Sequence, residues 1–66
     1  MNPIEFKAFC KESRKDFFKK FPAPKTKERN FWRNANRHAN NALEDGYYNP
    51  EFFCGSAKKI IELLKA

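Results

Sequence analysis

The sequence predicts an all-α protein: a small three-helix bundle in which residues 1–66 form a single helical domain. Apolar residues recur at helical spacing in three segments, and Asn-Pro pairs and a Pro-Ala-Pro segment separate these segments. No stretch shows the strict alternation of apolar and polar residues that is typical of a strand. We therefore expect helices at about residues 3–21, 26–45 and 50–65, joined by short links.

The first helix is expected to begin at Asn2-Pro3, because Asn caps helices well and Pro suits the first helical position. Glu5 then falls in the first turn, where a carboxylate favours the positive end of the helix dipole. The segment "FPAPK" ends the helix, because each Pro forces the residue before it out of the α region. The core face predicted from a rotation of about 100° per residue contains Phe6, Phe9, Cys10, Ser13, Phe17 and Phe21.

The second helix is expected to be capped by Thr26 and to end where Gly46 takes the left-handed conformation. Three alanines on its apolar side leave little bulk, so a neighbouring helix can approach its backbone closely. The predicted core face contains Phe31, Trp32, Ala35, Ala39, Ala42 and Leu43.

The third helix is expected to begin at Asn49-Pro50. Gly55-Ser56 leaves two alternatives: the helix continues through the glycine, or Ser56 caps a shorter helix. The predicted apolar face contains Phe53, Ala57, Ile60, Ile61 and Leu64, with Phe52 and Leu63 at its margin.

The composition indicates a partner of negative charge. Fourteen Lys and Arg against eight Asp and Glu give a net charge of +6, which attracts polyanions. A solvated basic surface without such a partner is the alternative. No apolar run is long enough to span a membrane. The first residues lack a secretory signal, so we expect a cytoplasmic protein with reduced Cys10 and Cys54, although a single disulfide is possible by composition.

Catalysis and bound cofactors are not expected. His38 is the single histidine, and its helix supplies no partner that would make it part of a catalytic group. Two cysteines and one histidine fall short of a four-ligand zinc site. We therefore expect no enzyme, no metal and no cofactor.

The segment "RNFWRNANRHANN", residues 29–41, holds five of the seven Asn and every Arg except Arg14. Arg and Asn both bond phosphates and base edges, and Arg is preferred over Lys for planar contacts. Drift in base composition is the alternative explanation for the Asn. With the apolar side turned inward, the outer side of this helix is expected to carry Arg29, Arg33, Asn36, Arg37 and Asn40.

The first helix adds a second candidate surface. Lys11, Arg14 and Lys15 lie opposite its core face, and Phe18 lies among them. An exposed Phe there suits stacking on a base or anchoring a protein interface, whereas in the alternative it covers the Pro22 and Pro24 link or meets Ile4. Tyr48, in the link after Gly46, is a further candidate contact residue.

Three hypotheses follow. The first is a small basic accessory protein that binds DNA or RNA through the Arg/Asn-rich helix face. The second is a non-enzymatic inhibitor or adaptor, of the kind that phages and mobile elements encode, that docks on an acidic surface of a host protein. The third is a homodimer formed through a wide apolar face of the third helix that includes Phe52, Leu63 and Cys54.

Overall fold

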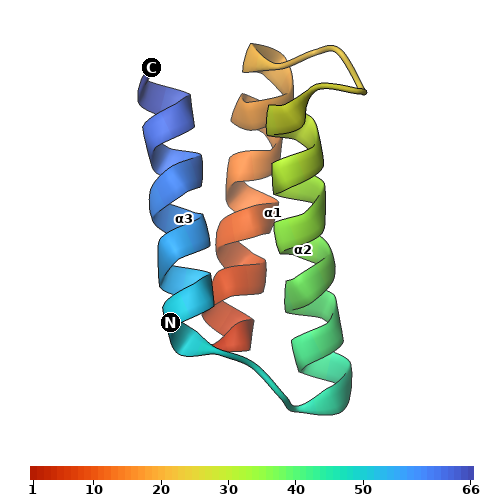
Figure 1. Ribbon diagram of the computed structural model, residues 1–66, viewed down its shortest axis with the longest axis vertical. Coiled ribbons are helices and arrows are strands. Elements are labelled where there is room, and N and C mark those ends of the chain that lie inside the picture. The colour runs from red at the N-terminus through yellow and green to blue at the C-terminus, as the bar shows by residue number, and fades with distance from the viewer.

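Three helices run up, down and up, side by side, in the computed structural model, which describes residues 1–66 (Figure 1). They are α1 (Pro3–Lys20), α2 (Lys27–Asp45) and α3 (Pro50–Lys65), and the chain has no strand. This confirms the predicted three-helix bundle. None of the helices combines the length and the apolar character that crossing a membrane requires.

The helix ends follow from local chemistry. The side chains of Asn2, Thr26 and Asn49 cap the three helices, and the first two accept a backbone N–H of the first turn at 2.8 and 3.2 Å. Gly46 ends α2 with a φ of 76°, a conformation that costs a glycine little. The predicted boundaries hold to within one residue: α1 ends at Lys20, and α2 begins after its cap.

Helices α1 and α3 are parallel neighbours, so their corresponding ends meet (Figure 1). At one end the Met1 amine lies 3.6 Å from the Sγ atom of Cys54. At the other end the Lys20 ammonium donates to the carbonyls of Leu64, at 3.1 Å, and of Ala66. These contacts connect the first helix to the last.

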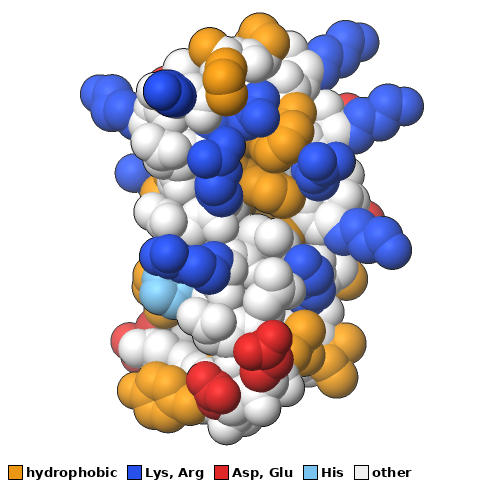
Figure 2. Space-filling view, turned by 90° about the vertical axis from the view of Figure 1, so that its right-hand side faces the viewer, with side chains coloured by type: hydrophobic (Ala, Val, Ile, Leu, Met, Phe, Trp, Pro, Cys, Tyr) orange, Lys and Arg blue, Asp and Glu red, His pale blue; other side chains and the backbone are white.

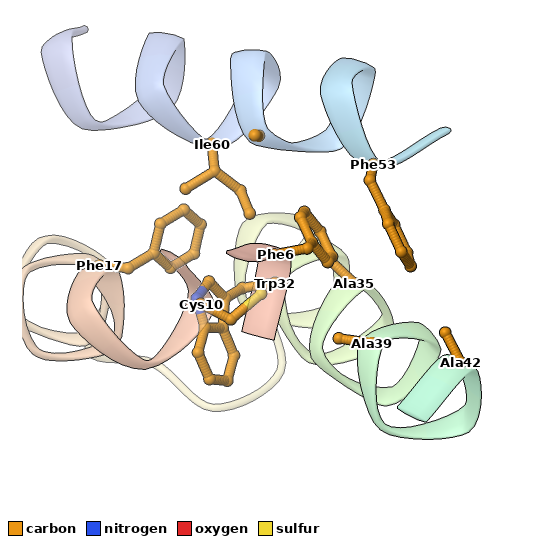
Figure 3. Close-up of a cluster of buried hydrophobic side chains, with 10 residues drawn as sticks. Phe6, Cys10, Phe17, Trp32, Ala35, Ala39, Ala42, Phe53 and Ile60 are labelled. Carbon is orange, nitrogen blue, oxygen red and sulfur yellow. The ribbon is translucent and has the colours of Figure 1, made fainter. Parts of the chain in front are cut away.

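The core lies on the common axis of the three helices (Figure 3). The rings of Phe6 and Phe53 stack with centroids 4.3 Å apart, and Phe17 and Ile60 are fully buried. Ala39 of α2 is also fully buried, and its small side chain lets the rings of α1 pack close to the α2 backbone. The buried hydrophobic residues are Phe6, Cys10, Phe17, Trp32, Ala35, Ala39, Ala42, Phe53, Ala57 and Ile60.

Two linked hydrogen bonds lie within this core. The indole N–H of Trp32 donates to Ser13 Oγ at 3.3 Å, and the Ser13 hydroxyl donates to the carbonyl of Cys10 at 3.2 Å. Because both of these donors have partners, the indole and the hydroxyl are buried without the cost of an unmade hydrogen bond. The sequence-based assignment of Ser13 and Trp32 to the core is confirmed.

The prediction that Leu43 and Ile61 belong to the core is wrong. Leu43 is 47% exposed and Ile61 is 40% exposed, because each lies at the edge of an apolar arc wider than the sector that three helices cover. Other residues at the margins of the arcs are partly buried against the core: Phe9, Phe21, Phe31, Leu63 and Leu64. Helix α3 continues through the exposed Gly55, and Ser56 is buried, so the continuous helix is the correct alternative.

Candidate nucleic-acid interface

Basic side chains from α1 and α2 meet along the line where the two helices pack. We call this surface the basic seam and define it by Lys7, Lys11, Arg14 and Phe18 of α1 and by Arg29, Arg33 and Asn36 of α2. Lys7 Nζ donates to Asn36 Oδ1 at 2.8 Å across the seam. Figure 2, which faces the α2 side of the molecule, shows Lys and Arg side chains scattered over its upper and middle parts, whereas the prominent acidic side chains lie near its lower end.

Phe18 forms the centre of the seam. Its ring is half-buried, lies edge-to-face against Trp32 with centroids 5.0 Å apart, and is flanked by the guanidinium groups of Arg14 at 4.7 Å and Arg29 at 3.6 Å. Of the alternatives for Phe18, the freely exposed ring is therefore wrong. Nor does this ring meet Ile4, whose side chain is 72% exposed. Residues on both helices cover the ring because it lies on the flank of α1 that faces α2.

Arg29 also differs from its predicted position on the outer side of α2. It is half-buried and turned toward α1, where its Nη1 donates to the carbonyls of Phe21 at 3.0 Å and Pro22 at 3.3 Å. These carbonyls follow the end of α1 and lack helical partners, so the guanidinium satisfies them. Arg33 is exposed and reaches the Pro24 carbonyl at 3.5 Å. Two arginines of α2 thus hold the link that precedes their own helix.

The Asn side chains of α2 fall into two groups, one half-buried and one exposed. Asn36 and Asn40 are half-buried, and the amide oxygen of Asn36 is already engaged by Lys7. Arg37 is exposed on the outer surface of α2, together with the Asn side chains at positions 30, 34 and 41. The exposed groups are suited to contacts with phosphates. A bidentate contact of Asn36 with a base would first require the loss of its hydrogen bond to Lys7.

Charge is segregated around α1. Glu5, Glu12 and Asp16 are spaced seven and four residues apart and share one stripe of the helix. Lys7, Lys11 and Arg14 have the same kind of spacing on a different stripe, which borders α2, and the exposed Lys15 extends it. The bonds made by Lys7, Arg29 and Arg33 go to neutral oxygens, so these contacts leave the positive charge of the seam uncompensated.

Tyr48 is not brought to the seam. It lies in the link between α2 and α3, with its ring stacked on Phe53 at a centroid distance of 5.7 Å and an interplanar angle of 7°. His38 lies edge-to-face against Phe52 at 4.9 Å. These rings line a separate pocket at the opposite end of α2 from the seam's arginines. Sequence reasoning missed this pocket, although acidic residues in the last turn of α2 are an unusual feature that could have indicated it.

Both cysteines are free. Burial raises the pKa of the Cys10 thiol from its ordinary 9.0 to about 11, although nearby Lys7 acts in the opposite direction. Cys54 is exposed on α3. No three His, Cys, Asp or Glu side chains gather as a metal site would require.

The exposed apolar side chains of α3 lie on two flanks of the helix. Phe52 contacts His38 of α2, whereas Cys54 and Ile61 line a shallow pocket with Met1 on the α1 side. Leu63 is partly buried against the core. The surface proposed for a homodimer is therefore split rather than continuous.

The fold and this surface define a class, a short three-helix bundle with a basic seam between its first two helices. Comparison of the chain with protein-family models, with curated proteins and with solved structures finds no match.

Proposed function

We propose that this protein binds nucleic acid through the basic seam and the adjoining outer surface of α2, mainly by contacts with phosphates. The observation that supports this most is the convergence of Arg and Lys from two helices on one surface, with their hydrogen bonds made to neutral acceptors. Such a surface attracts the phosphate backbone whatever the base sequence of the nucleic acid.

The side chains divide into two groups by what they contact. Arg29 and Phe18 fix the geometry of the seam, since both are half-buried and in contact with each other. The exposed cations within the seam and beside it can donate to phosphate oxygens, and they are Lys11, Arg14, Lys15, Arg33 and Arg37. This division favours non-specific or weakly specific binding, because few of the exposed groups are held in a geometry that recognises base edges.

The docking of the same surface on an acidic protein receives less support. An interface of that kind usually has an aromatic anchor at its centre. Phe18 is covered by Arg14, Arg29 and Trp32, and the partly exposed Tyr48 lies elsewhere. No aromatic side chain is thus free at the centre of the seam.

Fluorescence anisotropy with duplex DNA, single-stranded DNA and a structured RNA, at about 50 and 200 mM salt, tests the proposal. If five or six phosphates are neutralised, the affinity falls by several hundred-fold or more over this range of salt. Binding that is insensitive to salt, or no binding at the lower concentration, would contradict the proposal.

A pair of charge-matched variants locates the surface. Arg33→Glu with Arg37→Glu and Lys58→Glu with Lys65→Glu each lower the net charge by four, and all four side chains are exposed. We expect the α2 variant to lose at least tenfold more affinity than the α3 variant. Equal losses would mean that the overall charge, rather than the seam, attracts the nucleic acid.

A further inference from the structure

The link at residues 46–49 joins α2 to α3 at one end of the molecule (Figure 1). A pocket of about 330 Å³ opens beside this link. Four Tyr and Phe side chains line it, from Tyr47, Tyr48, Phe52 and Phe53, and Asp45 supplies a carboxylate. His38 and Asn41 of α2 complete much of the remaining wall. The basic seam uses none of these groups, and only Asn41 adjoins the outer surface of α2 that is proposed to contact nucleic acid.

Two aromatic rings of the pocket, those of Tyr48 and Phe52, are held by ring contacts and remain accessible. Tyr48 stacks on the buried Phe53 and is 38% exposed, and Phe52 is braced by His38 and is 43% exposed. Tyr47 is 83% exposed. The face of an aromatic ring carries negative electrostatic potential and attracts a cation that lies over it.

The charge at this end of α2 is also suited to a cation. The last turns of α1 and α3 carry Lys, as the negative end of a helix dipole favours, but the last turn of α2 has no base. It carries Glu44 and Asp45 instead, so that carboxylates adjoin the carbonyl end of the helix in a protein with a net charge of +6. A bound cation relieves this unfavourable arrangement.

We propose that the pocket binds an arginine side chain from a basic segment of a partner protein. A planar guanidinium stacks on aromatic rings and pairs with a carboxylate such as that of Asp45 through two parallel hydrogen bonds. The pocket volume lies at the low end of the range for ligand sites, which suits a single long side chain. This site is independent of the proposed nucleic-acid surface and has the opposite charge preference.

A titration of the ¹⁵N-labelled protein with hexa-arginine, followed by the backbone amide signals, tests this proposal. A citrulline hexamer serves as the uncharged control with nearly the same shape. We expect hexa-arginine, and not the citrulline peptide, to shift the amides of Asn41, Asp45, Tyr47 and Phe52. Asp45→Asn and Tyr47→Ala should each raise the dissociation constant at least fivefold, and both positions are exposed, so the fold should persist.

Glu62→Gln is the matched control, because it removes one negative charge from an exposed site on α3 outside the pocket. It should leave the dissociation constant within twofold. Equal weakening by Glu62→Gln and Asp45→Asn, equal binding of the citrulline peptide, or shifts confined to other amides would overturn the proposal. Pocket shifts that grow with protein concentration in the absence of peptide would also overturn it, since a second copy of this chain would then be the occupant.

Discussion

The guanidinium carbon of Arg29 lies 3.6 Å from the centre of the Phe18 ring, and the same guanidinium donates to the carbonyls of Phe21 and Pro22. One side chain of α2 therefore covers a ring of α1 and also holds the backbone that leaves α1. This relationship joins the fold to the proposed function, because it sets the position of the cationic groups around the ring.

Replacing Arg29 with Ala should lower the free energy of unfolding by about 1–3 kcal/mol, the sum of a cation–π contact and two hydrogen bonds. Urea denaturation followed by circular dichroism measures the change. Arg37→Ala removes the same charge from an exposed position and should change the stability by less than about 0.5 kcal/mol. Similar effects of the two variants would mean that the Arg29 contacts contribute little.

Phe18→Leu should weaken the binding of single-stranded DNA by less than twofold, because the ring is covered by side chains of the protein and does not stack on a base. A ring that stacks on a base contributes about 1–3 kcal/mol, which corresponds to a loss of roughly fivefold to more than a hundredfold. Anisotropy titrations distinguish these outcomes, and a loss in the larger range would assign Phe18 a direct contact with the nucleic acid.

Ala39→Leu should destabilise the protein by about 1–3 kcal/mol, because added methyl groups at a fully buried position force the packed rings apart. Ala8→Leu makes the same change at an exposed position of α1 and should be nearly neutral. Thermal unfolding of the two variants provides the comparison. A neutral Ala39→Leu would indicate that the α1–α2 interface is looser than the packing described above.

The Cys10 thiol should make stability depend on pH in the alkaline range. Its pKa rises from 9.0 in the unfolded chain to about 11 in the folded protein, so above pH 9.0 the unfolded chain loses the proton first. The free energy of unfolding is then expected to fall by about 2 kcal/mol between pH 9 and 11 and to change little from this group below pH 9.

Cys10→Ala removes this titration while Tyr and Lys still titrate, so the difference between the two pH profiles isolates the thiol. A thiol-reactive dye gives a second measurement. Exposed Cys54 should react quickly at pH 8, whereas buried Cys10 should react only as the protein unfolds. Parallel pH profiles for the two proteins, or equally fast labelling of both thiols, would show that Cys10 is accessible to water.

The helix boundaries could be predicted because they depend on residues close together in the chain. Asn2, Thr26 and Asn49 cap their helices, and Gly46 ends α2, through bonds and backbone preferences within one turn. The central core residues were equally accessible to prediction, since the rotation per residue fixes which side chains share a face. The errors at Leu43 and Ile61 arose at the edges of those faces, where exposure depends on how far a neighbouring helix reaches.

The amino-acid sequence by itself thus determined three capped helices, a core of Phe and Ala, and a strongly basic surface. Only the tertiary structure decided that Arg29 and Asn36 turn toward α1, that Phe18 lies beneath guanidinium groups, and that Tyr48 belongs to a separate pocket. The reason is physical: rotation within one helix specifies a direction around its own axis, whereas the side chain that a residue meets depends on the packing of a second helix against it.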